Sequence, residues 1–553
     1  QELHPIIVAP AGVPREVWKR RAFKYTLAYA SPESDWSEVL DVFVDKMNTL
    51  VTGKYFMDPF GKSHLLCVPI LAWIGDHLEL NDLAWVYPKA CRKCLEDAEL
   101  GITVHRTLEQ GIQNTKEMWE QWQQPLQKTL AYKKSQKLQQ HIGVAPLMKL
   151  EVFDLYQQTP ACPGHSENQG RTKRHLNEHF KRMSAPTLEL IDDRLKKIPR
   201  FPGLVLHSAS NSVTFSKLIS KKTKLTAEEY QSIRAVILFL LIGLQPDNVQ
   251  YLWRLHVEYA AGYYKKEWSE YDRSYYSLLR TKFHTSFQQM FDDVIDFLHF
   301  PKGHDPLHDD ESIEQYGSFL NLDEMIFENC HQTSKRVKTN GKNINVQLLE
   351  QETRQHELDT LFPHHQTLYQ NYMHKPQPKS WTLKGRPVWE HWNDLHWKVQ
   401  VFQQCVSNLP NLVDAVGVYR KLFVPHLGAI LASDHIVLVE AGLDVPWVCI
   451  QEFFHLPGGD NTDPWMLVTL FQWADHSEPI DFCTGCPQVS QTEQYMILPA
   501  STIQQRVHLV PDPRKDHQGS FWINWWVTFG QFCYPEKHRE AVQAQYLIQQ
   551  ADN

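Results

Sequence analysis

Long apolar runs are missing from this 553-residue sequence: its most apolar stretch, residues 235–244, is about half as long as a membrane-spanning helix. Residues 1–4 show neither the charged nor the apolar region of a signal peptide. An initiator Met is also missing, which is compatible with a piece of a longer product. We therefore expect no membrane partner and an intracellular location.

Cysteine and net positive charge are scarce as well. Ten Cys residues in a chain of this length are too few for a disulfide scaffold, which favours a reducing compartment. The formal net charge of −8 gives no overall attraction to nucleic acid, so any DNA contact must come from local basic patches. No Walker A, dinucleotide-binding or G-x-S-x-G motif occurs, which disfavours nucleotide and serine hydrolase chemistry.

The remaining composition is that of a folded protein. Hydrophobic residues make up 42% of the chain and aromatic residues 12%, which supports packed cores, and the length predicts two or three domains. Basic clusters lie at residues 171–182, 194–200, 217–224 and 335–342. Each cluster is either a solvated helix face or a site of nucleic-acid contact.

The first 75 residues combine β-structure with one helix. Apolar runs predict strands over residues 3–10 and 23–30, and helical spacing of apolar side chains predicts a helix over 36–50. Strands over 54–57 and 64–74 flank a turn containing Asp58 and Gly61. The acid Asp76 directly follows the last of these strands.

Helical periodicity dominates the middle of the chain, and strands return at its end. Residues 91–311 read as an all-α block, in which Thr226-x-x-Glu229 has the pattern of a capping box. After a polar linker, short apolar runs separated by Gly, Pro and Asp predict a small C-terminal β-barrel or sandwich over residues 388–553.

Two groups of residues have metal-ligand types. Cys91-x-x-Cys94 supplies half of a structural Zn²⁺ site, a zinc knuckle within the helical block. Its second half would be either His105 or Cys162-x-x-His165, and buried thiols are the alternative. The segment from His304 to Asp310 also resembles a metal cluster, although we expect an exposed acidic loop there.

Several segments resemble, in the same order, the fungal Plavaka-type transposases, which are relatives of CACTA transposable elements. These segments are the strand before Asp76 with the nearby Cys pair; Ile191-Asp192-x-Arg194 followed by Pro199-x-x-Pro202-Gly203; residues 324–354; and Val507-His508-Leu-Val510-Pro511-Asp512. The chain departs from the family at Thr159-Pro160-Ala161, where the family often has an acid.

The resemblance implies an α+β multidomain protein built on an RNase H-like mixed sheet. That core would comprise residues 1–90 and 312–374, with residues 91–311 as a large all-α insertion before the last catalytic acid. Such enzymes use a D-D-E carboxylate triad and two Mg²⁺ or Mn²⁺ ions. Asp76 matches the second acid, and Glu328 or Glu324 matches the third. The first strand and its Asp have no counterpart, so we expect the chain as it stands to be inactive.

Three functions remain open at this point. The first is a domesticated, transposase-derived DNA-binding protein of the nucleus, acting alone or as an oligomer. Its expected phosphate contacts are Lys221, Lys222, Lys224, Lys335, Arg336 and Lys338. The second is a fragment of an active transposase that cleaves and transfers DNA strands. The third is a host-adopted chromatin or protein interaction module, whose C-terminal domain binds through Trp447, Trp465 and Trp473.

Overall fold

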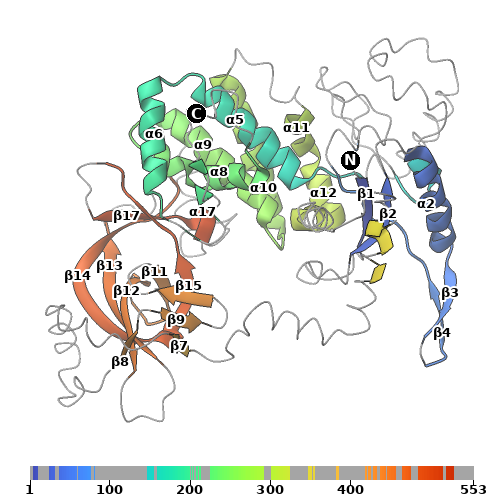
Figure 1. Cartoon of the computed structure of the whole chain (residues 1–553). Coiled ribbons are helices and arrows are strands. Elements are labelled where there is room, and N and C mark those ends of the chain that lie inside the picture. The colour runs from blue at the N-terminus through green and yellow to red at the C-terminus, as the bar shows by residue number, and fades with distance from the viewer. Residues whose placement is uncertain are drawn as a thin grey trace. The chain divides into compact units, whose positions relative to one another are not determined.

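The chain divides into two compact units, residues 1–178 with 262–366 and residues 179–261 with 367–553 (Figure 1). The structure, a computed structural model, describes residues 4–9, 24–30, 36–58, 60–75, 80, 146–154, 158–199, 201, 204, 207–208, 211–212, 225–291, 301–323, 347–350, 353–354, 382–384, 417–419, 421–424, 428–431, 436–443, 445–455, 464–474, 484–514 and 519–528. The predicted boundaries at residues 91, 311 and 388 stay predictions.

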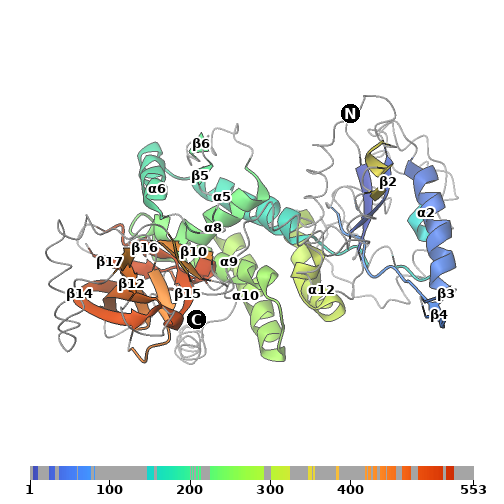
Figure 2. The same cartoon turned by 60° about the horizontal axis from the view of Figure 1, so that its bottom comes forward.

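The first unit begins with the predicted strands and helix. Strand β1 (His4–Val8) pairs antiparallel with β2 (Tyr25–Ala30). Helix α2 (Trp36–Val51) lies beside β2 in both views (Figures 1 and 2). The face of α2 that packs inward carries the apolar side chains at helical spacing, with Leu40 and Val44 buried against Ile6. The sequence prediction for this segment is confirmed.

A hairpin follows α2, with strands β3 (Lys54–Met57) and β4 (Ser63–Leu66) around the predicted turn. Gly61 takes a positive φ of 79°, which a glycine adopts without strain. The expected strand over 64–74 is too long, because β4 ends at Leu66.

Several backbone groups of residues 67–75 make hydrogen bonds outside a strand. Pro69 has no N–H to donate to a ladder. The amide of Trp73 donates to the carbonyl of Gln158 at 2.8 Å, and the Gln158 side chain donates to the carbonyl of Ile70 at 2.9 Å. Within the described residues, β1–β2 and β3–β4 are separate two-stranded sheets. An RNase H-like mixed sheet therefore stays a prediction.

Short helices and one long helix make up the rest of the first unit as the structure describes it. They are η4 (Pro146–Lys149), η5 (Gly164–Thr172), η6 (Gly262–Tyr264), α10 (Glu270–Met290), α11 (Pro301–His304), η8 (Asp305–His308), α12 (Asp309–Tyr316) and η9 (Phe319–Leu322), and α5 (Lys173–Phe180) continues η5 across the unit boundary. Buried His175 of α5 packs against Phe283, Phe287 and Phe291. The apolar side chains from which the helical periodicity of this segment was predicted thus face a core.

Helices α6 (Ala185–Lys197), α8 (Ala227–Leu241) and α9 (Asp247–Ala261) belong to the second unit, with the two-residue strands β5 (His207–Ser208) and β6 (Asn211–Ser212). Thr226 and Glu229 form the predicted capping box at the start of α8. At the other end, the Arg194 guanidinium donates to the carbonyls of Leu240 and Ile242 at 2.8 and 2.6 Å. A cation at a helix C-terminus is favourable because the last carbonyls have no helical partner.

The second unit also holds the C-terminal β-structure. Its strands are β7 (Thr382–Lys384), β8 (Gly417–Tyr419), β9 (Lys421–Val424), β10 (Gly428–Leu431), β11 (Ile436–Val439), β12 (Trp447–His455), β13 (Trp465–Trp473), β14 (Gln488–Pro499), β15 (Ile503–Val507), β16 (Leu509–Pro511) and β17 (Ser520–Ile523), and helix α17 (Trp525–Thr528) follows. Eight strands form one curved antiparallel sheet in the order β15-β11-β12-β13-β14-β17-β16, with β8 on β12.

This sheet curves into a near-barrel (Figure 1), as the sequence predicted for the C-terminal β-rich region. A smaller sheet, β10-β9-β7, adds Leu422, Val424 and Ile430 to the same core. The chain is therefore a mixed α and β protein. Among the described residues, no helix is both long enough and apolar enough to cross a bilayer.

Candidate functional site

The residues predicted for catalysis and DNA contact lie outside the described residues. These are Asp76, Glu324 and Glu328, and Lys221, Lys222, Lys224, Lys335, Arg336 and Lys338. The same holds for Cys91, Cys94 and His105 of the predicted zinc site. Their assignments stay predictions.

Cys162 and His165 are the two predicted metal ligands that the structure describes. Cys162 is buried just before η5, and His165 lies half-buried in the first turn of that helix. No group of three or more His, Cys, Asp or Glu side chains in the described ranges is arranged to hold a metal ion. Zinc binding through Cys91 and Cys94 stays a prediction.

The helix that follows Cys162 has an uncommon geometry. Element η5 is a nine-residue π-helix, whereas most π-helical segments are single turns and are frequent at functional sites. Seven of its residues are buried, among them Glu167 and Arg171. Gly170 permits close packing here, since a Cβ at this position would lie 2.8 Å from Cβ of Lys302. The π-helix therefore delivers charged side chains into the interior of the first unit.

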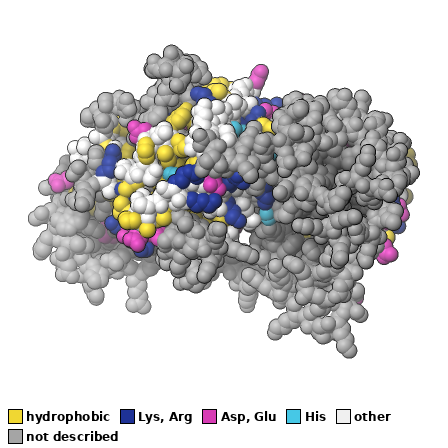
Figure 3. Space-filling model, turned by 90° about the horizontal axis from the view of Figure 1, so that it is seen from above, with side chains coloured by type: hydrophobic (Ala, Val, Ile, Leu, Met, Phe, Trp, Pro, Cys, Tyr) yellow, Lys and Arg dark blue, Asp and Glu magenta, His cyan; other side chains and the backbone are white. Residues whose placement is uncertain are grey.

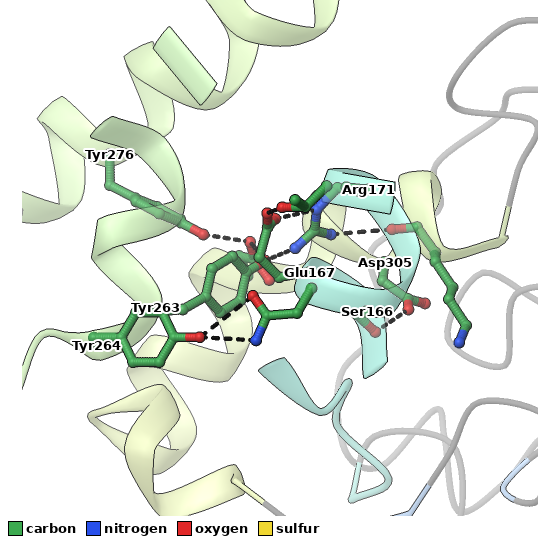
Figure 4. Close-up of polar contacts among 11 residues, drawn as sticks. Ser166, Glu167, Arg171, Tyr263, Tyr264, Tyr276 and Asp305 are labelled. Carbon is green, nitrogen blue, oxygen red and sulfur yellow. Dashed lines mark hydrogen bonds and ion pairs between the residues drawn. The ribbon is translucent and has the colours of Figure 1, made fainter. Parts of the chain in front are cut away.

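Arg171 is the centre of a buried polar network (Figure 4). Its Nε donates to Glu167 at 2.8 Å, one terminal nitrogen donates to the Tyr263 hydroxyl at 2.6 Å, and the other donates to the carbonyl of Lys302 at 3.0 Å. The guanidinium also lies 5.1 Å from the centre of the Tyr263 ring, within cation–π range. Thr172 donates to the second oxygen of Glu167 at 2.7 Å.

Asp309 extends the network to a second carboxylate. The hydroxyls of Tyr263 and Tyr276 both donate to the same oxygen of Asp309, each at 2.6 Å. Burial raises the pKa of Asp309, and the charges of Arg171 and Arg280 oppose that rise. Glu167, Arg171, Tyr263 and Asp309 thus form one connected chain from η5 to α12.

The segment from His304 to Asp310 supplies this second half, so the expectation of an exposed acidic loop is wrong. His304, Asp305, His308 and Asp309 are buried in α11, η8 and α12. Ser166 of the π-helix donates to Asp305 at 2.7 Å. Asp305 and Asp309 are buried because hydroxyl donors from distant parts of the chain compensate the loss of water.

This network holds η5, η6, α10 and α12 in one arrangement, which is a positioning role. Sequence reasoning missed it. A Glu and an Arg four residues apart in a stretch with two glycines is a weak signal, because the same pattern is common on solvated helices.

Replacing Arg171 by Met should leave Glu167 buried without its cation. Removing one partner of a buried pair costs about 3–5 kcal/mol, so we expect peptides covering 164–180 to lose hydrogen-exchange protection. Exchange mass spectrometry of the full chain measures this. Lys173→Met, at an exposed position of α5, is the matched control. Equal protection in the two variants would show that the ion pair does not stabilise η5.

A second polar centre, in the other unit, joins two segments of the Plavaka resemblance. Nε2 of His508 donates to the carbonyl of Pro199 at 3.1 Å, and the rings of His508 and Phe201 are 5.1 Å apart. Asn524 donates one Nδ2 bond to the carbonyl of Ala235 at 2.9 Å and another to Nδ1 of His508 at 3.3 Å. The start of the β16–β17 hairpin is thereby fixed to the helices of the same unit.

These contacts specify the neutral form of His508 that carries its proton on Nε2. A carbonyl only accepts, so Nε2 must donate, and Nδ1 must accept because the amide nitrogen of Asn524 only donates. Burial lowers the pKa of His508 to about 4, and the bond to Pro199 opposes that shift.

Nearby Asp512, also in the resembling segment, has a buried side chain. It pairs with Arg514 at 2.6 Å and accepts from Gln488 at 2.7 Å. Its negative charge raises the pKa of Arg194, which burial lowers more strongly. Two of the resembling segments are thus also linked electrostatically, through Arg194 and Asp512.

His179 repeats the arrangement of His508 elsewhere in the second unit. The Trp253 indole donates to its Nδ1 at 2.7 Å, and its Nε2 donates to Gln245 at 3.4 Å. Burial lowers the pKa of His179 to about 4, with a smaller contribution from Arg182.

No family model, curated protein or solved structure matches this chain. The Plavaka resemblance therefore stays a prediction that rests on the order of its segments.

The second unit should lose stability in mild acid. The pKa of both His179 and His508 falls from 6.5 in the unfolded chain to about 4 in the fold, so the unfolded state binds protons more readily between these values. The stabilisation is complete above pH 6.5 and is lost as the pH falls from 6.5 through 4, by about 3 kcal/mol for each histidine.

Thermal unfolding followed between pH 7 and pH 4 checks this prediction. His508→Gln is the informative variant, because a Gln amide donates and accepts like the Nε2–H tautomer but does not titrate. It should reduce the pH dependence by roughly half. An unchanged slope would show that His508 is not buried in its neutral form.

Proposed function

We propose that this chain is a transposase-derived DNA-binding protein of the nucleus, with Plavaka-type ancestry. Catalysis is not part of the proposal, since the three candidate acids lie outside the described residues. The observation that carries the proposal is the contact between the Arg194–Pro199 and His508–Asp512 segments.

This contact supports common ancestry by a physical argument. Chance matches to short family patterns have no reason to meet in space. His508 and Pro199 are 309 residues apart, yet they share a partly buried hydrogen bond with a defined tautomer. Replacing His508 would leave the amide of Asn524 and the carbonyl of Pro199 without this partner, which costs free energy. The fold therefore constrains the residue at position 508, within one of the resembling segments.

Local basic surface supports DNA as the partner. Figure 3 shows Lys and Arg side chains gathered near the middle of the face seen from above. In the second unit, Lys181 and Arg182 are exposed directly before α6, and Lys196 and Lys197 are exposed in its last turn. By contrast, Arg171, in the same predicted cluster as Lys181, is buried and cannot contact phosphate.

An interaction module based on the C-terminal tryptophans has less support. Trp447 is buried, and its ring makes an edge contact with Trp473 at 5.3 Å. Trp465 is half-buried on the neighbouring strand. Trp447 and Trp473 thus pack on each other, which is the commoner use of such residues.

We expect the full chain to bind duplex DNA with a steep salt dependence. Each bound phosphate contributes a slope of about −0.9 in a plot of log affinity against log salt. Replacing Lys181, Arg182, Lys196 and Lys197 by Gln should make that slope shallower by about 0.9 for each phosphate that the variant no longer binds. Fluorescence anisotropy between about 50 and 200 mM salt measures the effect.

Matched variants separate the regions of the chain. Lys46→Gln with Lys62→Gln removes two exposed charges of the first unit and should leave the slope unchanged. A third variant replaces Lys221, Lys222 and Lys224, and a fourth replaces Lys335, Arg336 and Lys338, to test the phosphate contacts predicted from sequence. Salt-insensitive binding, or no binding to duplex DNA, would refute the proposed function.

A further inference from the structure

The turn between β16 and β17 begins with a carboxylate and a guanidinium that hold each other. The Asp512 side chain is fully buried, whereas the side chain of Arg514 is 37% exposed. Nε of Arg514 donates to both oxygens of Asp512, at 3.0 and 3.1 Å, and Nη2 donates to one of them at 2.6 Å. The planar guanidinium fork matches a carboxylate in this geometry. The head of Arg514 therefore has a defined position at the surface.

Further contacts fix both members of this pair. The backbone amide of Arg514 donates to Asp512 at 3.0 Å, and Gln488 of β14 donates to the same carboxylate at 2.7 Å. The guanidinium carbon lies 5.7 Å from the centre of the buried Trp522 ring, within cation–π range. A side chain that is ordered beforehand loses less conformational entropy when it binds a ligand.

The pairing also sets the direction of the remaining donors of Arg514. A guanidinium carries five N–H groups in a fixed fork, and it approaches Asp512 with Nε and Nη2. The third nitrogen, Nη1, lies opposite that edge of the planar group, so its two N–H groups point away from the carboxylate. Guanidinium N–H groups match the geometry of phosphate oxygens as well as that of carboxylates.

Positive charge gathers where α6 ends near this turn. Burial lowers the pKa of Arg194, and the charge of Asp512 opposes that shift, so one acid interacts with the guanidiniums of both Arg194 and Arg514. Lys197, which is exposed, neighbours Arg194 on the surface of α6 because the two are three residues apart. An anion bound beside Arg514 would balance this charge.

The basic groups continue along α6, which favours an extended polyanion over a single carboxylate. Lys181 and Arg182 are exposed before the start of this 13-residue helix, and Lys197 is exposed at its end. A helix of this length spans about 20 Å, whereas DNA presents a phosphate about every 3.4 Å along each strand. One DNA strand can therefore contact several of these groups.

We propose that Arg514, held by Asp512, binds a backbone phosphate of duplex DNA next to α6. This inference rests on the proposed function, and it adds the C-terminal β-structure to the DNA-contacting surface. Arg514 lies outside the four basic clusters of the sequence. Its surroundings come from α6, β14 and β17, which only the fold brings together.

Fluorescence anisotropy of the full chain with duplex DNA, between about 50 and 200 mM salt, tests the proposal. The decisive variant combines Arg514→Gln with Asp512→Asn, because it keeps the net charge of the chain and leaves no buried carboxylate without its cation. We expect its slope of log affinity against log salt to be shallower than the parent's by about 0.9, the contribution of one phosphate. A pair that only shapes the turn would leave the slope unchanged, which would overturn the proposal.

Two further variants serve as comparisons. Arg514→Lys keeps the charge but not the fork, so it should keep the slope and lower the affinity severalfold. A slope reduced as in the double variant would contradict the phosphate contact, since a lysine still displaces counterions. Arg273→Gln, at an exposed position of α10, should leave slope and affinity unchanged. Thermal unfolding of each variant establishes that it is folded.

The outcomes separate this inference from the proposed function. If the parent binds duplex DNA with a steep slope and the double variant has the same slope, only the Arg514 contact is refuted. If the parent does not bind duplex DNA, the proposed function is refuted and the contact with it. Equal slopes together with a loss of affinity for a fluorescent oligoglutamate peptide would assign Arg514 to an acidic protein partner instead.

Discussion

A single buried guanidinium, that of Arg171, connects the helices η5, η6 and α11 of the first unit. It satisfies Glu167 on its own helix, Tyr263 on η6 and a carbonyl of α11, and Tyr263 passes the connection on to Asp309. Breaking one hydrogen bond of such a network costs more free energy than that bond alone contributes. The remaining members are then buried polar groups that have neither their partner nor water. Seven of the nine residues of the π-helix η5 are buried, two of them glycines, so the network lies in the interior of the unit.

The second unit buries two of its histidines in their uncharged form. His179 and His508 are held neutral, each with one nitrogen donating and one accepting, so no counter-charge is needed. Neutral burial avoids the desolvation penalty of an ion pair, but it fixes one tautomer and is sensitive to acid.

Local signals in the sequence predicted much of the fold. The α2 face, the Thr226 capping box and the hairpin turn at Asp58 depend on residues a few positions apart, and each was confirmed. The strand over 64–74 was wrong after Leu66 because the backbone there bonds to Gln158, about 88 residues away. The burial of Asp305 and Asp309 was also missed, because a cluster of charged residues in a sequence is normally exposed to solvent.

The burial of charged side chains in the candidate site could not be predicted from local sequence signals. Whether a carboxylate is buried depends on donors that only the tertiary fold brings near it, and Ser166 and Asp305 are 139 residues apart. The Plavaka resemblance is of another kind, since it is a pattern in the chain rather than a property of any one residue. Its strongest physical support is that two of its segments share the His508 bond, and that bond would survive loss of catalysis. A contact of this kind contributes to folding and needs no catalytic triad, so the proposed ancestry and an inactive chain are compatible with each other.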